Sequence, residues 1–129
     1  MTLLNGVGHQ CDGKEISVAI HGKSTGGYVK DCSSEEKPKI LADTTSIWST
    51  QDLGTNCKKI LFDPNKGLEL AVRTDAYGDP FCPTKVQLEI LDIDSKEPRF
   101  FCSKINSLGN KHKNNGERYD AKEERCFSD

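Results

Sequence analysis

The six cysteines of this 129-residue chain constrain its fold more than any other feature of the sequence. Between 19 and 24 residues separate neighbouring cysteines, so they are not grouped as the ligands of a structural zinc ion are. Even spacing of this kind is typical of disulfides formed in an oxidising compartment. We therefore predict three disulfides, in a pairing that the sequence does not choose, among Cys11, Cys32, Cys57, Cys82, Cys102 and Cys126.

The length predicts a single domain, residues 1–129, that is stabilised by its disulfides as well as by its core. No run approaches the ~20 consecutive apolar residues of a membrane-spanning helix, so the chain is not expected to be transmembrane. Residues 1–4 are too few to form the apolar part of a secretory signal. We expect a mature secreted, extracellular protein whose signal peptide has been removed.

The charge of the chain is close to balanced, with 18 Lys and Arg against 20 Asp and Glu, and both signs are scattered along it. A protein that neutralises phosphates along a nucleic acid needs a concentrated basic surface. The sequence therefore excludes nucleic acid as an expected partner.

Apolar residues alternate with polar or small ones over most of the chain. Ile16, Val18 and Ile20 form one such run, and the same period of two recurs over 68–73 and 85–90. This period is typical of strands with one buried face, and turn-forming residues separate the runs. We predict an all-β fold, an antiparallel β-sandwich of about eight strands. Shorter strands are expected within 28–30, 45–49, 57–62 and 99–103.

Two local features qualify this pattern. The alternation changes phase between Ile90 and Leu91, which predicts a bulge or a strand that crosses between sheets. Residues 117–125 are good helix formers with few apolar members. They predict a short C-terminal helix or tail, which Cys126 tethers to the sandwich.

The sequence contains no complete catalytic or metal-binding motif. His9, His21 and His112 are far apart and have no Cys or carboxylate at ligand spacing, so zinc is not expected. The segment from Asp92 to Asp94 begins like a calcium loop but is not followed by the Gly and Glu of an EF-hand. No Gly-x-Ser-x-Gly motif is present, and oxidised cysteines are not nucleophiles. We predict a non-enzymatic protein without a cofactor.

Three aromatic residues are the candidate binding residues. Trp48, the only Trp, lies in a segment rich in Ser and Thr, and Tyr77 and Phe81 flank a Gly-Asp-Pro turn. Aromatic side chains on loops often contact membranes or partner proteins. The alternative is that Trp48 fills the core as the inward residue of a strand, and that Tyr77 and Phe81 pack around Cys82.

Four segments occur in a characteristic order within residues 45–105: Asp52-Leu53-Gly54, Cys57 to Phe62, Lys85 to Glu89, and Arg99 to Cys102. This order resembles the later half of a PLAT/LH2 domain, the sandwich at the end of animal lipases and the start of lipoxygenases. The chain departs from the family at 81–83, where Phe-Cys-Pro replaces a Trp, and the calcium ligands of some members do not align with it. The resemblance implies a non-catalytic, eight-stranded sandwich that docks to lipid surfaces or proteins through its loops.

Together these observations favour a secreted, monomeric binding module that recognises a protein receptor or a lipid surface through its loops. Such a module would be a venom, salivary, effector or defence component. One alternative is a small secreted hydrolase that uses carboxylates and a His, with His21 at the end of a predicted strand; a carboxylate-lined cleft would favour it. A second alternative is a structural protein of an egg coat, mucus or matrix.

Overall fold

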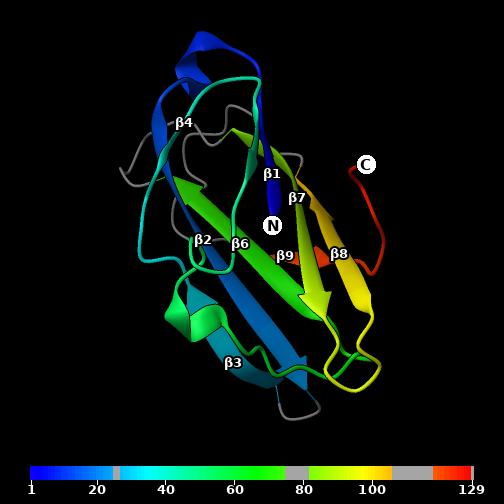
Figure 1. Cartoon of the computed structure of the whole chain (residues 1–129). Coiled ribbons are helices and arrows are strands. Elements are labelled where there is room, and N and C mark those ends of the chain that lie inside the picture. The colour runs from blue at the N-terminus through cyan, green and yellow to red at the C-terminus, as the bar shows by residue number, and fades with distance from the viewer. Residues whose placement is uncertain (25–26, 75–81, 106–117, 129) are drawn as a thin grey trace.

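The computed structural model describes residues 1–24, 27–74, 82–105 and 118–128. The described chain forms two antiparallel sheets, and the core takes residues from both (Figure 1). Nine strands lie within these ranges, beside two short 3₁₀ helices, η1 (His9–Cys11) and η2 (Thr55–Cys57). The structure therefore confirms the predicted all-β class and its antiparallel sandwich.

The two sheets have different strand orders. The four-stranded sheet has the order β5 (Thr45–Ile47), β1 (Thr2–Asn5), β7 (Pro83–Leu91) and β8 (Pro98–Lys104). The five-stranded sheet has the order β3 (Gly27–Ser33), β2 (Lys14–Ser24), β6 (Leu68–Thr74) and β9 (Arg118–Ala121), and β4 (Lys39–Ile40) pairs with the start of β2.

The alternating residues found in the sequence point into the core between the sheets. Ile16, Val18 and Ile20 of β2 are almost completely buried, and so are Leu70 and Val72 of the adjacent β6. The four-stranded sheet contributes Leu3, Val86, Leu88 and Phe101 to the same cluster. Burial of each such side chain stabilises the fold by about 1.5–3 kcal/mol, so the alternation supplies much of the driving force for folding.

The sheets are joined along the edge where β8 and β9 meet. Beyond the end of β9, Lys122 forms a bridge with Cys102 of β8 through two backbone hydrogen bonds, of 2.7 and 2.8 Å. The hydroxyl of Ser103 also donates to the carbonyl oxygens of Tyr119 and Asp120, at 3.3 and 3.1 Å. This edge is therefore closed by hydrogen bonds.

The predicted C-terminal helix is wrong. Residues 118–121 form β9, in which Tyr119 and Ala121 pack against the core while Arg118 and Asp120 are exposed. The edge of β6 offers backbone partners to this segment, and pairing with them buries Tyr119. Tertiary pairing of this kind overrides a weak local helix propensity. The rest of the segment, 122–128, is the predicted tail.

Two further predictions from the pattern are corrected. Residues 57–62 do not form a strand; Cys57 ends η2 and the chain after it is irregular. No bulge or crossing occurs at Ile90, because β7 pairs with β8 in unbroken register until Leu91 faces Pro98. The phase change marks the end of β7 instead, and Leu91 and Ile93 lie exposed at the turn that follows.

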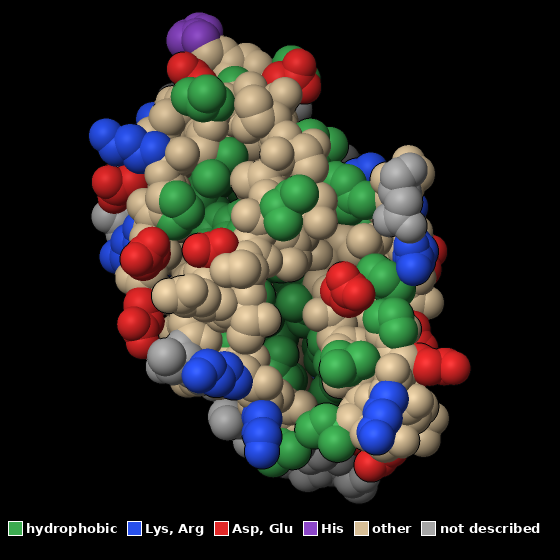
Figure 2. All heavy atoms as spheres, in the orientation of Figure 1, with side chains coloured by type: hydrophobic (Ala, Val, Ile, Leu, Met, Phe, Trp, Pro, Cys, Tyr) green, Lys and Arg blue, Asp and Glu red, His purple; other side chains and the backbone are tan. Residues whose placement is uncertain are grey.

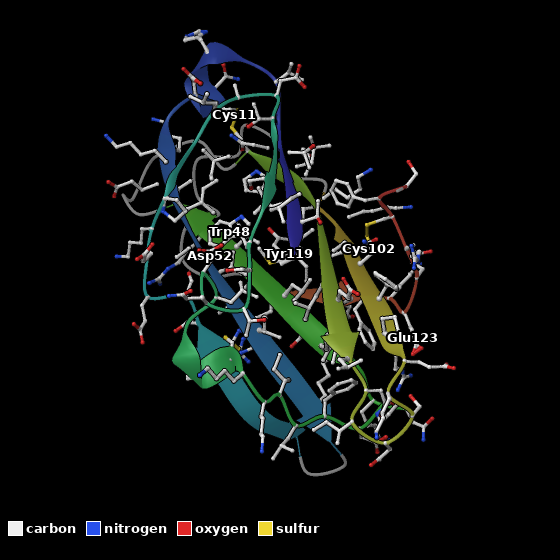
Figure 3. The ribbon with its side chains drawn as sticks, viewed as in Figure 1. Cys11, Trp48, Asp52, Cys102, Tyr119 and Glu123 are labelled. Carbon is white, nitrogen blue, oxygen red and sulfur yellow. A yellow bond between two sulfur atoms is a disulfide. The ribbon has the colours of Figure 1, made fainter. Side chains whose placement is uncertain are left out.

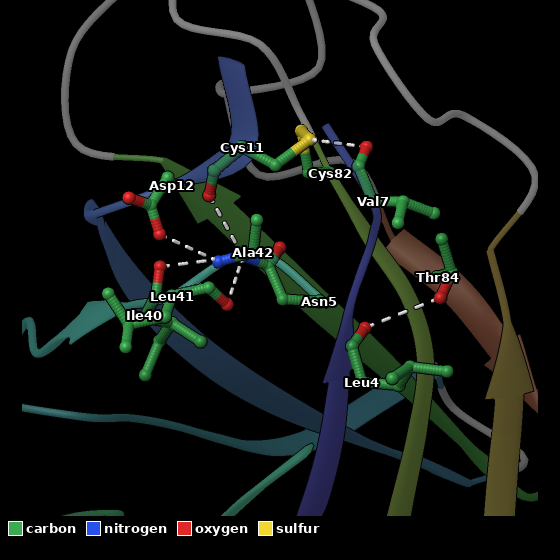
Figure 4. The surroundings of a disulfide bond; sticks show 10 residues. All are labelled: Leu4, Asn5, Val7, Cys11, Asp12, Ile40, Leu41, Ala42, Cys82 and Thr84. Carbon is green, nitrogen blue, oxygen red and sulfur yellow. Dashed lines mark hydrogen bonds between the residues drawn. A yellow bond between two sulfur atoms is a disulfide. The ribbon is translucent and has the colours of Figure 1, made fainter. Parts of the chain in front are cut away.

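The cysteines form three disulfides, as predicted. Cys11 of η1 pairs with Cys82, which directly precedes β7 (Figure 4). Cys32 of β3 pairs with Cys57 of η2, and Cys102 of β8 pairs with Cys126 of the tail. The predicted tether at Cys126 is thus confirmed. Within the part of the chain that the structure describes, no helix is long and apolar enough to cross a membrane.

The tail lies over the outer face of β7 and β8. The backbone N–H groups of Cys126 and Phe127 donate to Oε1 of Gln87, at 2.6 and 3.1 Å. The guanidinium of Arg125 lies 3.8 Å from the ring centroid of Phe100. These contacts are few and mostly polar, so the disulfide is the main restraint on this segment.

We expect the variant Cys126→Ser to release the tail before the sheets unfold. Local opening would then expose the bond after Arg125 to trypsin, and its cleavage should become at least about tenfold faster. Timed proteolysis with mass spectrometry measures this rate, and Ser128→Ala, which keeps the disulfide, is the control. Equal cleavage rates in the two variants would show that the disulfide does not hold the tail.

Candidate functional site

The turn between β7 and β8 exposes two large aliphatic side chains. Leu91, the last residue of β7, is 65% exposed and Ile93 is 73% exposed. Soluble proteins expose single apolar residues often, so exposure alone does not define a site. Here, however, only one residue separates two such side chains, where β7 ends and the turn of the hairpin begins. Figure 2 shows hydrophobic side chains reaching the surface among charged ones at this end of the molecule.

The backbone of this turn is held by its own hydrogen bonds. Oδ1 of Asp92 accepts from the backbone N–H groups of Asp94 and Ser95, at 2.9 and 3.2 Å. The carbonyl oxygen of Asp92 accepts from the N–H of Lys96 at 2.7 Å, and Lys96 takes the left-handed conformation with φ of 60°. An Asp side chain that caps its own turn favours this geometry. The turn therefore presents Ile93 on an ordered backbone.

Arg99 links the turn to the C-terminal tail. Its guanidinium lies 3.6 Å from Oδ2 of Asp92, and its Nη2 donates to both carboxylate oxygens of Glu123, with 2.9 Å between Nη2 and Oε2. Figure 3 labels Glu123. Exposed ion pairs add little stability, but two hydrogen bonds to one carboxylate restrict its position. Arg99 thus connects the exposed hairpin to the segment that Cys126 anchors.

The structure supports the core interpretation of Trp48. Its side chain is only 4% exposed and belongs to the core cluster, and its indole N–H donates to Oγ of Ser46 at 2.9 Å. It is therefore not a solvent-exposed contact residue of the kind predicted for the binding surface. The other two candidates, Tyr77 and Phe81, lie outside the described residues.

A small hollow of about 170 Å³ lies beside Trp48. Ile40 and Ile47 line it together with the carboxylates of Glu36 and Asp52. The backbone N–H of Ser49 donates to Oδ2 of Asp52 at 2.8 Å, and this hydrogen bond lowers the pKa of the Asp52 carboxyl. Asp52 therefore stays ionised as a cap of its own turn, where its charge is already hydrogen-bonded.

His21, the residue of the hydrolase hypothesis, is 7% exposed and lies on the outer side of β2. It lies beside a larger hollow whose described lining contains basic and hydroxyl side chains but no carboxylate. Glu69 of β6 faces His21 in register, but it does not line this hollow, so the described lining is not the carboxylate-lined cleft that would favour a hydrolase.

Sequence reasoning missed Leu91 and Ile93 as candidate contact residues. The signal is the change of apolar parity after Ile90, which on its own favours a bulge or a strand that crosses between sheets. A strand that ends at Leu91 explains the change more simply, because residues in a turn no longer alternate between a core face and a solvent face.

Comparison of the chain with protein-family models, with curated proteins and with solved structures found no match in any of the three.

Proposed function

We propose that this chain is a secreted, non-enzymatic binding module that contacts a partner protein through the tip of the β7–β8 hairpin. The observation that carries the proposal is the exposure of Leu91 and Ile93 on an ordered turn. Burial of a large aliphatic side chain contributes about 1.5–3 kcal/mol. Because the turn is already ordered, little of this free energy is spent on fixing the backbone when a partner binds.

The charges of the turn favour a protein over a lipid surface as the partner. Residues 91–97 contain Asp92, Asp94 and Glu97 against Lys96, a formal charge of −3 + 1 = −2. The surfaces of biological membranes are commonly anionic, so they would repel this turn. A protein surface with an apolar depression and nearby basic groups would complement both the aliphatic side chains and the carboxylates.

Two further observations support secretion of the protein and binding through its loops. Three disulfides are formed, and disulfides of this kind persist in oxidising compartments, which supports secretion. The two-sheet architecture is also the one that the PLAT/LH2 resemblance implies, and domains of that family dock through loops. Membership of that family remains our hypothesis.

The double variant Leu91→Ser/Ile93→Ser tests the proposal. Immobilised protein would capture partners from serum and from cell-surface extracts, and the captured protein would be purified and titrated. Loss of both aliphatic contacts should weaken that binding by about thirtyfold or more, as expected for residues at the centre of an interface. Both side chains are exposed, so the change should leave the free energy of unfolding nearly unaltered.

The matched control is Val7→Ser/Leu61→Ser, which removes two aliphatic side chains of other loops that are each at least 60% exposed. The control should bind as the unmodified chain does. Equal affinity of both double variants would contradict a hairpin contact. Liposome flotation that the hairpin variant abolishes would assign the hairpin to a lipid surface instead. Hydrolysis of a substrate, or self-association in gel filtration, would favour the hydrolase or the matrix-protein hypothesis respectively.

A further inference from the structure

A hollow of about 360 Å³ lies on the outer face of the five-stranded sheet. Its floor consists of small side chains, because Ala19 of β2 faces Ala71 of β6 on one side and Ser33 of β3 on the other. These residues alternate with the core residues of the same strands, so they lie on the outer face, where Ser33 is exposed, Ala19 is half-buried and Ala71 is buried. Three small residues in one row leave a space above the sheet. Larger side chains of the neighbouring rows surround this space.

The walls of the hollow are basic. Arg73 of β6 and Arg118 of β9 stand on one side of the floor, and Lys37, from the chain after β3, also lines the hollow. The described residues of the lining include no carboxylate. The formal net charge of the chain is −2, whereas three cationic side chains line this one hollow, so the local charge is opposite in sign to that of the chain. Such a surface attracts anions.

Two hydroxyl oxygens of the hollow already accept hydrogen bonds. Oγ of Ser17 accepts from Nε of Arg73 at 3.3 Å, and Oγ of Ser34 accepts from the backbone N–H of Val18 at 3.0 Å. A hydroxyl that already accepts still has one hydrogen to donate. The bond to Ser17 also orients the guanidinium of Arg73. Donors therefore predominate over acceptors in this hollow.

The acidic residues of the same face begin in the row of His21, which faces Asp31 of β3 and Glu69 of β6 in register. His21, which lines the end of the hollow, is followed in its row by Glu69 and Asp120 on the neighbouring strands. Their carboxylates lie 3.8 and 2.8 Å from Nζ of Lys23. Lys23 thus compensates the carboxylates of Glu69 and Asp120, and the charged side chains in the described lining of the hollow are basic.

We infer that this hollow binds a small organic oxyanion, a phosphate or sulfate monoester. Guanidinium groups such as those of Arg73 and Arg118 bind the paired oxygens of such a group, and the serine hydroxyls would supply further donors. The volume lies in the range of sites for small organic molecules, so it accommodates an ester as well as the anion itself. The site lies on the other sheet from the β7–β8 hairpin and does not depend on its role.

Titration with phenyl phosphate, phenyl sulfate, inorganic phosphate and phenol, followed by calorimetry and by backbone amide shifts, tests the inference. Arg73→Gln/Arg118→Gln should weaken binding of the esters by at least about tenfold. The control Lys58→Gln/Lys122→Gln removes an equal number of positive charges from residues outside the hollow. This control should retain the affinity of the unmodified chain. The amides of Ser17 and Ser34 should shift on binding.

Tighter binding of the esters than of inorganic phosphate would identify an ester as the ligand class. Equal binding of the two would support the oxyanion site and assign it to the free ion. The inference is overturned if neither anion binds at millimolar concentration, or if phenol binds as well as phenyl phosphate. It is also overturned if the two double variants bind equally. Retained ester binding in Leu91→Ser/Ile93→Ser would separate this site from the proposed protein contact.

Discussion

Replacement of both Cys11 and Cys82 by alanine is expected to lower the free energy of unfolding by about 4 kcal/mol. This disulfide joins residues that are 71 positions apart, whereas the other two join residues 25 and 24 apart. A longer closed loop removes more conformational freedom from the unfolded chain. The shorter loops predict about 3.5 kcal/mol each, so the loss at Cys11 and Cys82 should be the largest of the three.

The position of this disulfide adds a structural reason for its effect. It attaches η1 to the start of β7, and a sulfur of the pair lies 3.5 Å from the carbonyl oxygen of Val7 (Figure 4). Both cysteines are completely or almost completely buried. Without the bond, the loop that follows β1 loses its covalent attachment to the start of β7, the strand that pairs with β1.

Urea unfolding under non-reducing conditions, followed by circular dichroism, measures this loss. The paired variant Cys32→Ala/Cys57→Ala is the matched control, because it also removes two sulfurs and one cross-link. A smaller loss for Cys11→Ala/Cys82→Ala than for the control would show that loop length does not determine the ranking.

The substitution Asn5→Asp is expected to destabilise the protein by about 3–5 kcal/mol at neutral pH. Asn5 is only 1% exposed, and its amide nitrogen faces three backbone carbonyl oxygens (Figure 4). The distances from Nδ2 are 3.0 Å to the oxygen of Cys11, 3.5 Å to that of Ile40 and 3.1 Å to that of Leu41. This one side chain thus ties β1 to η1 and to the chain around β4.

Aspartate has nearly the same shape as asparagine but directs a charged oxygen at these carbonyl oxygens. The buried charge would have no donor in place of the lost amide hydrogens, which makes it unfavourable. Protonation of the introduced carboxyl removes the charge and restores one donor. The loss of stability should therefore shrink as the pH falls, because the folded variant binds this proton more tightly than the unfolded chain does.

Thermal and urea unfolding between neutral and mildly acidic pH check this prediction. Asn5→Ala, which removes the amide without adding a charge, should lose only about 1–3 kcal/mol and show no matching change with pH. If Asn5→Asp were as stable as Asn5→Ala at neutral pH, the carbonyl oxygens would be satisfied in another way and Asn5 would not organise this region.

The sequence by itself determined the class of the fold and the identity of much of its core. Apolar residues with a period of two, such as Ile16, Val18 and Ile20, have only one way to bury a continuous face, which is a strand over a core. Six evenly spaced cysteines likewise predicted three disulfides and a tethered C-terminal tail. These properties are local or compositional, so they can be read without knowing which strands are neighbours.

Only the tertiary structure decided which parts of the chain meet. The pairing of Cys11 with Cys82, the strand at 118–121 and the burial of Trp48 all depend on contacts between distant segments. The basic hollow has the same origin, because Ser17 and Arg73 become neighbours only through the register of β2 and β6. The register of two strands is the one that minimises the free energy of the whole sheet, so the local sequence of either strand does not specify it.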